Sequence, residues 1–124
     1  MELRTVAGLA VCLAVLGISR PAAADDDPWW GRDKALHFGV SAGLAAGGYG
    51  VSSLFLEPRW QRAALGGGFA LTLGAGKEAY DATGRGDASI KDFTWDVAGA
   101  AVGVAVALLV DVVVSGSAAH ETAR

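Results

Sequence analysis

The chain has 124 residues, of which 52% are hydrophobic and only 8% aromatic; it contains 18 glycines and carries a formal net charge of −3. This length allows one domain, and the apolar content excludes an intrinsically disordered chain. The acidic balance, without a cluster of Lys or Arg, argues against nucleic acid as a partner. A single cysteine, Cys12, excludes an intrachain disulfide and a thiol-based zinc cluster.

The N-terminal segment has the order of a secretory signal peptide. Glu2 and Arg4 precede an apolar run from Thr5 to Ile18, and the small residues Ala22 to Ala24 precede an acidic run. This order predicts cleavage after Ala24, so that residues 1–24 are removed. An uncleaved N-terminal anchor is the alternative, although the apolar run is shorter than the ~20 residues of a full membrane span.

Three apolar segments follow the predicted signal peptide. Residues 35–56 carry no formal charge if His37 is neutral, residues 63–76 are uncharged but shorter, and residues 97–110 continue past Asp111 through three valines. We predict an all-α fold, a small bundle of about three Gly- and Ala-rich, membrane-embedded helices within residues 25–114. A soluble bundle is the alternative, because the second and third segments are short enough to be core helices. Residues 115–124 are predicted to form a disordered tail.

Small residues recur four positions apart in each segment, at Gly39, Gly43 and Gly47, at Gly66, Ala70 and Gly74, and at Gly99 and Gly103. Such stripes let helix backbones approach closely in lipid. In water, each glycine would cost a helix about 1 kcal/mol relative to alanine. The stripes therefore favour a membrane environment, and they suggest a homo-oligomer.

The orientation of the bundle follows from the predicted signal peptide. If the mature N-terminus is exported, the first segment runs inward and the arginine-containing link at residues 57–62 is cytoplasmic. Residues 77–92 then lie on the outer face. We expect a protein of the bacterial cell envelope with this face toward the periplasm.

The unusual polar residues gather at that outer end, where three separate stretches of the chain meet. Asp33 and His37 share a helix face, as do Lys77 and Asp81. Ionisable groups near hydrocarbon pair with one another or face a wet cavity. We therefore predict a binding cluster that comprises Asp33, Lys34, His37, Lys77, Glu78, Asp81, Arg85, Asp92 and Asp96.

The predicted cluster has two interpretations. In the structural one, Lys34 and Lys77 neutralise carboxylates and the set only aligns three helices. In the other, it handles a ligand: His37 exchanges protons near neutral pH, the carboxylates hold a divalent cation, and Arg85 with Lys91 binds phosphate. One histidine with scattered carboxylates is not a specific ligand pattern, so no metal is assigned, and no cofactor is predicted.

Catalysis by the cluster would fall to His37, Asp92 and Asp96. Asp92 also fits a helix-start signal, because it follows Ser89 by three residues. We expect a non-enzymatic envelope protein, structural or accessory, that binds a lipid or cell-wall head group or a partner helix. Its expected partners are membrane lipids and an envelope protein or cell-wall precursor. The alternative is a minimal membrane hydrolase or transferase acting on a lipid-linked phosphate.

Three ordered blocks of the sequence carry a family resemblance. They run from Asp33 to Phe38 with Ser41, from Gly76 to Asp81, and from Gly86 to Ala100. Together they resemble the YfiM-like family of predicted periplasmic lipoproteins and, more distantly, VanZ-like membrane proteins. The resemblance implies a small envelope protein of unestablished activity, linked to glycopeptide tolerance or cell-surface chemistry, with the predicted cluster at its motif positions. Cys12 departs from the lipoprotein pattern, because no lipobox precedes it.

Overall fold

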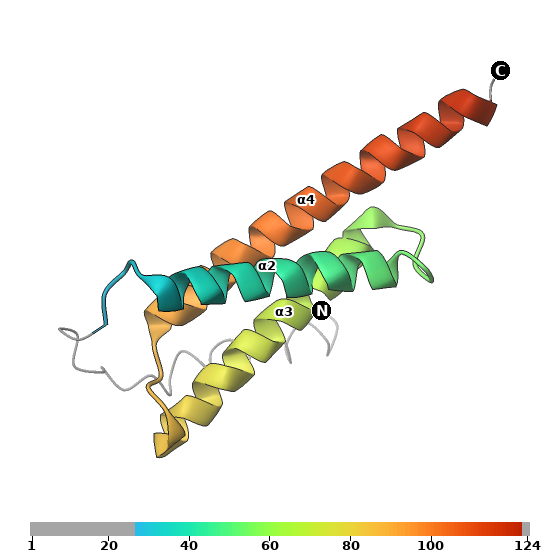
Figure 1. Ribbon diagram of the computed structural model, residues 1–124. Helices are drawn as coiled ribbons and strands as arrows, with labels where there is room; N and C mark the ends of the chain where they lie inside the picture. The colour runs from blue at the N-terminus through green and yellow to red at the C-terminus, as the bar shows by residue number, and fades with distance from the viewer. Residues whose placement is uncertain (1–26, 123–124) are drawn as a thin grey trace.

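The computed structural model describes residues 27–122, and within this range the fold is three long helices without a strand. These are α2 (Arg32–Ser52), α3 (Arg59–Tyr80) and α4 (Ile90–Thr122), with a short π-helical turn, η1 (Asp81–Arg85), after α3. Figure 1 shows α2 lying across α3 and α4, and α4 extending beyond both. The predicted all-α bundle is therefore confirmed. The predicted signal peptide lies outside the described residues.

Local sequence signals mark the ends of these helices. Gly31 precedes α2 at φ +153°, and Gly84 turns the chain after α3 at φ +90°, two conformations that side-chain-bearing residues rarely adopt. Pro58 immediately precedes α3. The hydroxyl of Ser89 accepts a hydrogen bond of 3.2 Å from the amide of Asp92, so the predicted cap of the last helix forms.

The C-terminal segment differs from its prediction as a disordered tail. From residue 115 to Thr122 the chain continues α4 as helix. Alanine is the residue most favourable to helix, and the hydroxyls of Ser117 and Thr122 donate to carbonyls four residues earlier. Side-chain hydroxyls that would otherwise compete with the helix are therefore bonded within it.

Glycines set the closest helix contacts. A Cβ at Gly99 or Gly103 of α4 would lie 2.2 Å from a carbonyl oxygen of α2, that of Phe38 or Ala42. A Cβ at Gly66 of α3 would lie 2.4 Å from the carbonyl oxygen of Ala45 in α2. These two helices use their predicted small-residue stripes for packing.

The predicted stripe of α2 behaves differently. Gly39, Gly43 and Gly47 are exposed, and a Cβ at any of them would meet nothing within 4 Å. The interior face of α2 instead carries Lys34, His37, Ser41, Ala45, Tyr49 and Ser52. The expectation that the α2 glycines pack within the bundle is wrong, because the polar residues of the same helix take the interior face.

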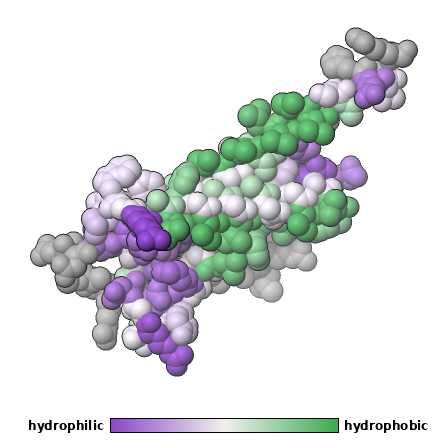
Figure 2. Space-filling view, in the orientation of Figure 1, coloured by the Kyte–Doolittle hydropathy of each residue, from purple (hydrophilic) through white to green (hydrophobic). Residues whose placement is uncertain are grey.

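The distribution of polarity is inverted relative to a soluble core. The buried hydrophobic residues among those described are Ala45, Tyr49, Ala70 and Ala100, whereas seven polar or charged residues are buried, namely Lys34, His37, Ser41, Ser52, Glu78, Asp92 and Asp96. Large apolar side chains on all three helices face outward. Figure 2 shows hydrophobic patches along the middle of the bundle, separated by residues of intermediate hydropathy, and the largest group of polar residues at one end. Soluble domains rarely bury charge in this proportion.

One helix among the described residues is long and apolar enough to cross a membrane, by length and composition alone. It is the segment Ile90–Ala119 of α4, which is mostly unburied in the bundle. Helices α2 and α3 have spanning lengths but do not meet the same criterion over the described chain. Of the three predicted spans, only the last meets this criterion.

Candidate functional site

The polar side chains of the bundle gather where α2 and α4 begin and α3 ends. This end cluster consists of buried residues from α2 (Lys34, His37, Ser41), α3 (Glu78) and α4 (Asp92, Asp96), together with Asp27, which precedes α2. The spacing of three or four residues within α2 and α4 places each set on one helix face. Antiparallel packing of α3 then brings Glu78 to the same end.

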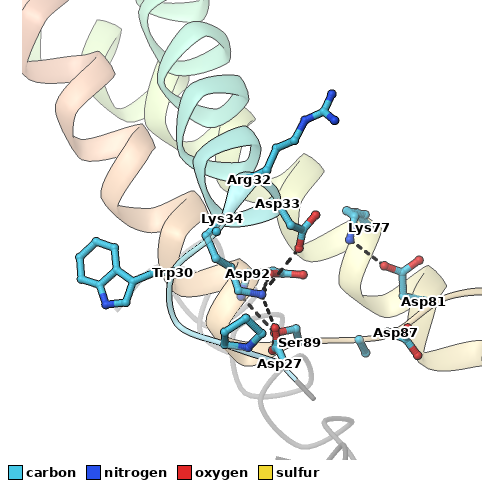
Figure 3. A pocket seen from close by; sticks show the side chains of 13 residues that line it. Asp27, Trp30, Arg32, Asp33, Lys34, Lys77, Asp81, Asp87, Ser89 and Asp92 are labelled. Carbon is cyan, nitrogen blue, oxygen red and sulfur yellow. Dashed lines mark hydrogen bonds and ion pairs between the residues drawn. The ribbon is translucent and has the colours of Figure 1, made fainter. Parts of the chain in front are cut away.

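Lys34 is the centre of the outer half of the end cluster. Its ammonium donates hydrogen bonds to the carboxylates of Asp27 and Asp92 and lies 3.6 Å from Asp33 (Figure 3). The residue is only 3% exposed. A buried ammonium is tolerated only when it is paired in this way. The hydrogen bond from Lys34 also lowers the pKa of Asp27 below its ordinary value.

The segment before α2 is held over the start of α4, which explains how Asp27 reaches Lys34. The indole of Trp95 donates to the carbonyl of Trp29 at 2.9 Å, and the ring of Trp95 lies 5.1 Å from that of Trp30. The hydroxyl of Ser89 donates to the Asp27 carboxylate. Sequence analysis missed Asp27, because it belongs to an acidic run that looked like the residues following a cleavage site.

His37 joins the two carboxylates of α4. Its Nδ1 lies 3.0 Å from Oδ1 of Asp96, and its Nε2 lies 3.4 Å from Oδ2 of Asp92. The hydroxyl of Ser41 donates to the same Asp96 oxygen at 2.8 Å. The other oxygen, Oδ2 of Asp96, is buried without a hydrogen-bond partner among the described residues. An orphaned buried carboxylate oxygen is costly and needs an explanation.

Glu78 is the buried carboxylate that α3 contributes. It is 6% exposed, and its Oε2 accepts a hydrogen bond of 2.6 Å from the amide of Ser89. Burial raises the pKa of the Glu78 carboxyl above its ordinary value, although the Ser89 amide acts in the opposite direction. Lys77 lies at the edge of the cluster, 3.2 Å from Glu78 and 2.7 Å from Asp81.

Two hollows adjoin the end cluster. A cleft of about 710 Å³ opens at the end of the bundle, lined by the segment before α2, the start of α2, the end of α3 and the loop before α4 (Figure 3). A groove of about 280 Å³ runs along α2 and α3 beside His37, Ser41, Gly74 and Asp96. Gly74 makes room for Asp96, because a Cβ there would lie 2.7 Å from its Oδ2.

The structure brings most of the predicted cluster together. Lys34, His37, Glu78, Asp92 and Asp96 are mutually close and buried, while Asp33, Lys77 and Asp81 lie at the rim. Arg85 does not join them: its guanidinium lies over the ring of Tyr80, 5.5 Å from the centroid. Arg85 follows the turn at Gly84, and it lies outside the end cluster in which the sequence analysis placed it.

A second polar contact lies at the opposite end of the bundle. Asp111 accepts hydrogen bonds from the hydroxyl of Tyr49 at 2.7 Å, from Arg62 at 2.9 Å and from Arg59 at 3.2 Å. The sequence placed Asp111 inside or at the end of a span but offered no partner for it. These groups from α2 and α3 neutralise the carboxylate of Asp111.

Two triads of the end cluster offer ligand atoms that lie within 4.8 Å of one another. One comprises Asp33, His37 and Asp92, and the other His37, Glu78 and Asp96. All three members of the second triad are buried. Imidazole and carboxylate groups are ordinary ligands of divalent cations.

Comparison of the chain with models of protein families, with curated proteins and with solved structures finds no match. The resemblance to YfiM-like and VanZ-like proteins therefore stays a prediction, and the function must be argued from the geometry of the chain itself.

Proposed function

We propose that this is a small membrane-embedded protein of the bacterial cell envelope whose end cleft binds an amine-bearing head group of a lipid or cell-wall precursor. The observation that carries the proposal is the inverted polarity of the bundle. Large apolar side chains on every helix face outward, while Lys34, Glu78, Asp92 and Asp96 are buried. This distribution suits hydrocarbon surroundings, where charged groups turn inward and pair.

The cleft end has the character of a membrane interface. Trp30, which is 77% exposed, lines the cleft, and Trp29, which is 50% exposed, precedes it in the chain. The middle of the bundle surface is largely apolar (Figure 2). Tryptophan is enriched where hydrocarbon meets head groups. A ligand in the cleft would therefore lie at head-group depth.

The charge of the cleft favours a cationic group on its ligand. Five acidic residues line it, Asp27, Asp33, Asp81, Asp87 and Asp92, against three basic ones, Arg32, Lys34 and Lys77. Lys34 is engaged by Asp27 and Asp92, and Arg32 points away from the other labelled side chains (Figure 3). The excess of carboxylates can accept hydrogen bonds from a primary amine. The volume of about 710 Å³ is that of a small-molecule site.

Head-group binding is tested by native mass spectrometry of the full chain in vesicles of phosphatidylethanolamine or phosphatidylglycerol. We expect retained phosphatidylethanolamine to exceed phosphatidylglycerol several-fold, and Asp33→Asn with Asp87→Asn to remove that preference. The matched control is Glu57→Gln with Glu121→Gln, which removes the same charge away from the cleft. Equal retention of the two lipids by the unaltered protein would contradict the proposal.

The orientation is tested by labelling single cysteines with an impermeant maleimide, in a Cys12→Ser background and in cells with a permeabilised outer membrane. Asp87 follows η1 at the cleft end, and Glu57 lies between α2 and α3 at the other end; both are exposed. We expect Asp87→Cys to be labelled and Glu57→Cys to be protected until the inner membrane is lysed. Labelling of both before lysis would place the whole bundle outside the membrane.

The enzymatic alternative is a hydrolase or transferase acting on a lipid-linked phosphate. One observation favours it: His37 lies between two buried carboxylates, an arrangement that can orient an imidazole for proton transfer. Release of phosphate from a lipid-linked diphosphate by the reconstituted chain would support it, provided that Asp96→Asn abolishes release without unfolding the protein. Release that persists in this variant would exclude the mechanism.

A further inference from the structure

We propose that His37, Glu78 and Asp96 form a binding site for one divalent transition-metal cation of the Zn²⁺ class, inside the bundle and separate from the head-group cleft. Each ligand comes from a different helix: His37 from α2, Glu78 from α3 and Asp96 from α4. Their ligand atoms lie within 4.8 Å of one another, and all three residues are buried. A cation at this point would therefore join the three helices.

The unpartnered oxygen of Asp96 points to a ligand. Ser41 and His37 approach its Oδ1, whereas Oδ2 is buried beside Gly74 without a partner in the described part of the chain. Gly74 and Glu78 are four residues apart on α3 and so share the face that meets Asp96. The orphaned oxygen thus lies on the side from which Glu78 approaches.

The balance of buried charge calls for a cation of this valence. Among the described residues, the buried carboxylates of Glu78, Asp92 and Asp96 face a single buried ammonium, that of Lys34. With a neutral His37 the buried side chains sum to −2, and Lys77, half-exposed at the rim and 3.2 Å from Glu78, offsets part of this charge. An uncompensated buried charge is strongly unfavourable, and a bound cation offsets the remainder.

The ligand chemistry favours Zn²⁺ over Mg²⁺ or Ca²⁺. Zn²⁺ accepts both imidazole nitrogen and carboxylate oxygen as ligands, whereas Mg²⁺ and Ca²⁺ prefer oxygen alone. Ligands bound to zinc at about 2.1 Å lie about 3.4 Å apart, and the 3.0 Å from Nδ1 of His37 to Asp96 is close to this spacing. The ligand atom of Glu78 lies within 4.8 Å of the other two.

The surroundings supply the remaining features of such a site. If Nδ1 of His37 binds the cation, its Nε2 is left to donate to Asp92, 3.4 Å away, which Lys34 holds in place. A carboxylate behind a metal-bound histidine fixes the ring in this way. The groove of about 280 Å³ reaches His37 and Asp96, and it gives access to a fourth coordination position.

The experiment titrates Zn²⁺ by calorimetry, and Co²⁺ by visible absorption, into the full chain in detergent after metal stripping. We expect one cation per chain, and a loss of affinity of at least about 10–100-fold in His37→Gln, Glu78→Gln and Asp96→Asn. Glu57→Gln is the matched control, because it removes an exposed carboxylate at the opposite end of the bundle and should leave affinity unchanged. Circular dichroism checks that each variant keeps its helix content.

Three outcomes would overturn the proposal. One is the absence of binding tighter than about 1 mM by the unaltered chain. Another is undiminished affinity in folded Glu78→Gln and Asp96→Asn. A third is loss of binding in Asp33→Asn but not in Glu78→Gln, which would place the ion in the other triad. If Asp96→Asn fails to fold, the affinity of Glu78→Gln and the cobalt spectrum of the unaltered chain test the proposal. The detergent contains no amine lipid, so failure here leaves the head-group proposal standing.

Discussion

The two ends of the bundle neutralise their carboxylates in different ways. At one end, Asp111 is a single carboxylate that receives two arginines and a tyrosine hydroxyl, so its charge is more than matched. At the other end, three buried carboxylates share one buried ammonium, and one oxygen of Asp96 has no partner among residues 27–122. The first end is a closed structural contact, while the second retains capacity to bind. Function is therefore expected at the unbalanced end.

The largest effect should come from removing the ammonium group of Lys34 at the unbalanced end. Lys34→Met keeps the length of the side chain but leaves Asp27 and Asp92 without their ammonium. Breaking a buried ion pair costs about 3–5 kcal/mol, and we expect the free energy of unfolding in detergent to fall by this amount. Added Zn²⁺ should restore part of it if the metal site exists. A loss no greater than that of Arg62→Met would mean that the two ends are alike.

Separating α2 from α4 should disturb both ends at once. In Gly99→Ala the new methyl group would lie 2.2 Å from the carbonyl oxygen of Phe38, so the helices must move apart. We expect a loss of about 1–3 kcal/mol in thermal or denaturant unfolding. Gly43→Ala is the matched control, since its Cβ meets nothing within 4 Å. Equal damage in the control would indicate that the α2 stripe packs against a second copy of the chain.

The balanced end should tolerate the loss of one cation. In Arg62→Met, Asp111 keeps the hydroxyl of Tyr49 and the guanidinium of Arg59. We expect a loss of about 1.5–3 kcal/mol, typical of one hydrogen bond to a charged group, with metal affinity unchanged. Calorimetric titration of this variant with Zn²⁺ checks the second expectation. A weaker metal site would show that the ends are coupled through α4.

The smallest effect is a dependence of stability on acid pH. Lys34 lowers the pKa of Asp27 in the folded chain below its ordinary value of 3.8. The folded state therefore binds this proton less readily than the unfolded state, so the contribution is present above pH 3.8 and is lost as the pH falls through the lowered value. We expect Asp27→Asn to flatten the fall of the melting temperature in this range. An unchanged acid profile would mean that Asp27 does not pair with Lys34.

The sequence was informative wherever the signals were local. Three apolar segments and the Ser89 cap predicted three helices, and the stretches around His37, Lys77 and Asp92 predicted that polar groups meet at one end. It was wrong about α2, in which two candidate stripes lie on different faces. Gly39, Gly43 and Gly47 formed the better packing pattern, but the polar stripe of Lys34, His37 and Ser41 faces inward.

The amino-acid sequence by itself determined the helices, their ends and the supply of charged groups at each end, because these depend on residues within a few positions of one another. Only the tertiary structure decided which helix face is interior, that Arg85 stays outside the end cluster, and that Tyr49 and Arg62 neutralise Asp111. The contacts of His37 with Asp96 and of Tyr49 with Asp111 join residues 59 and 62 positions apart. Such pairings arise when helices pack, and no local pattern encodes them.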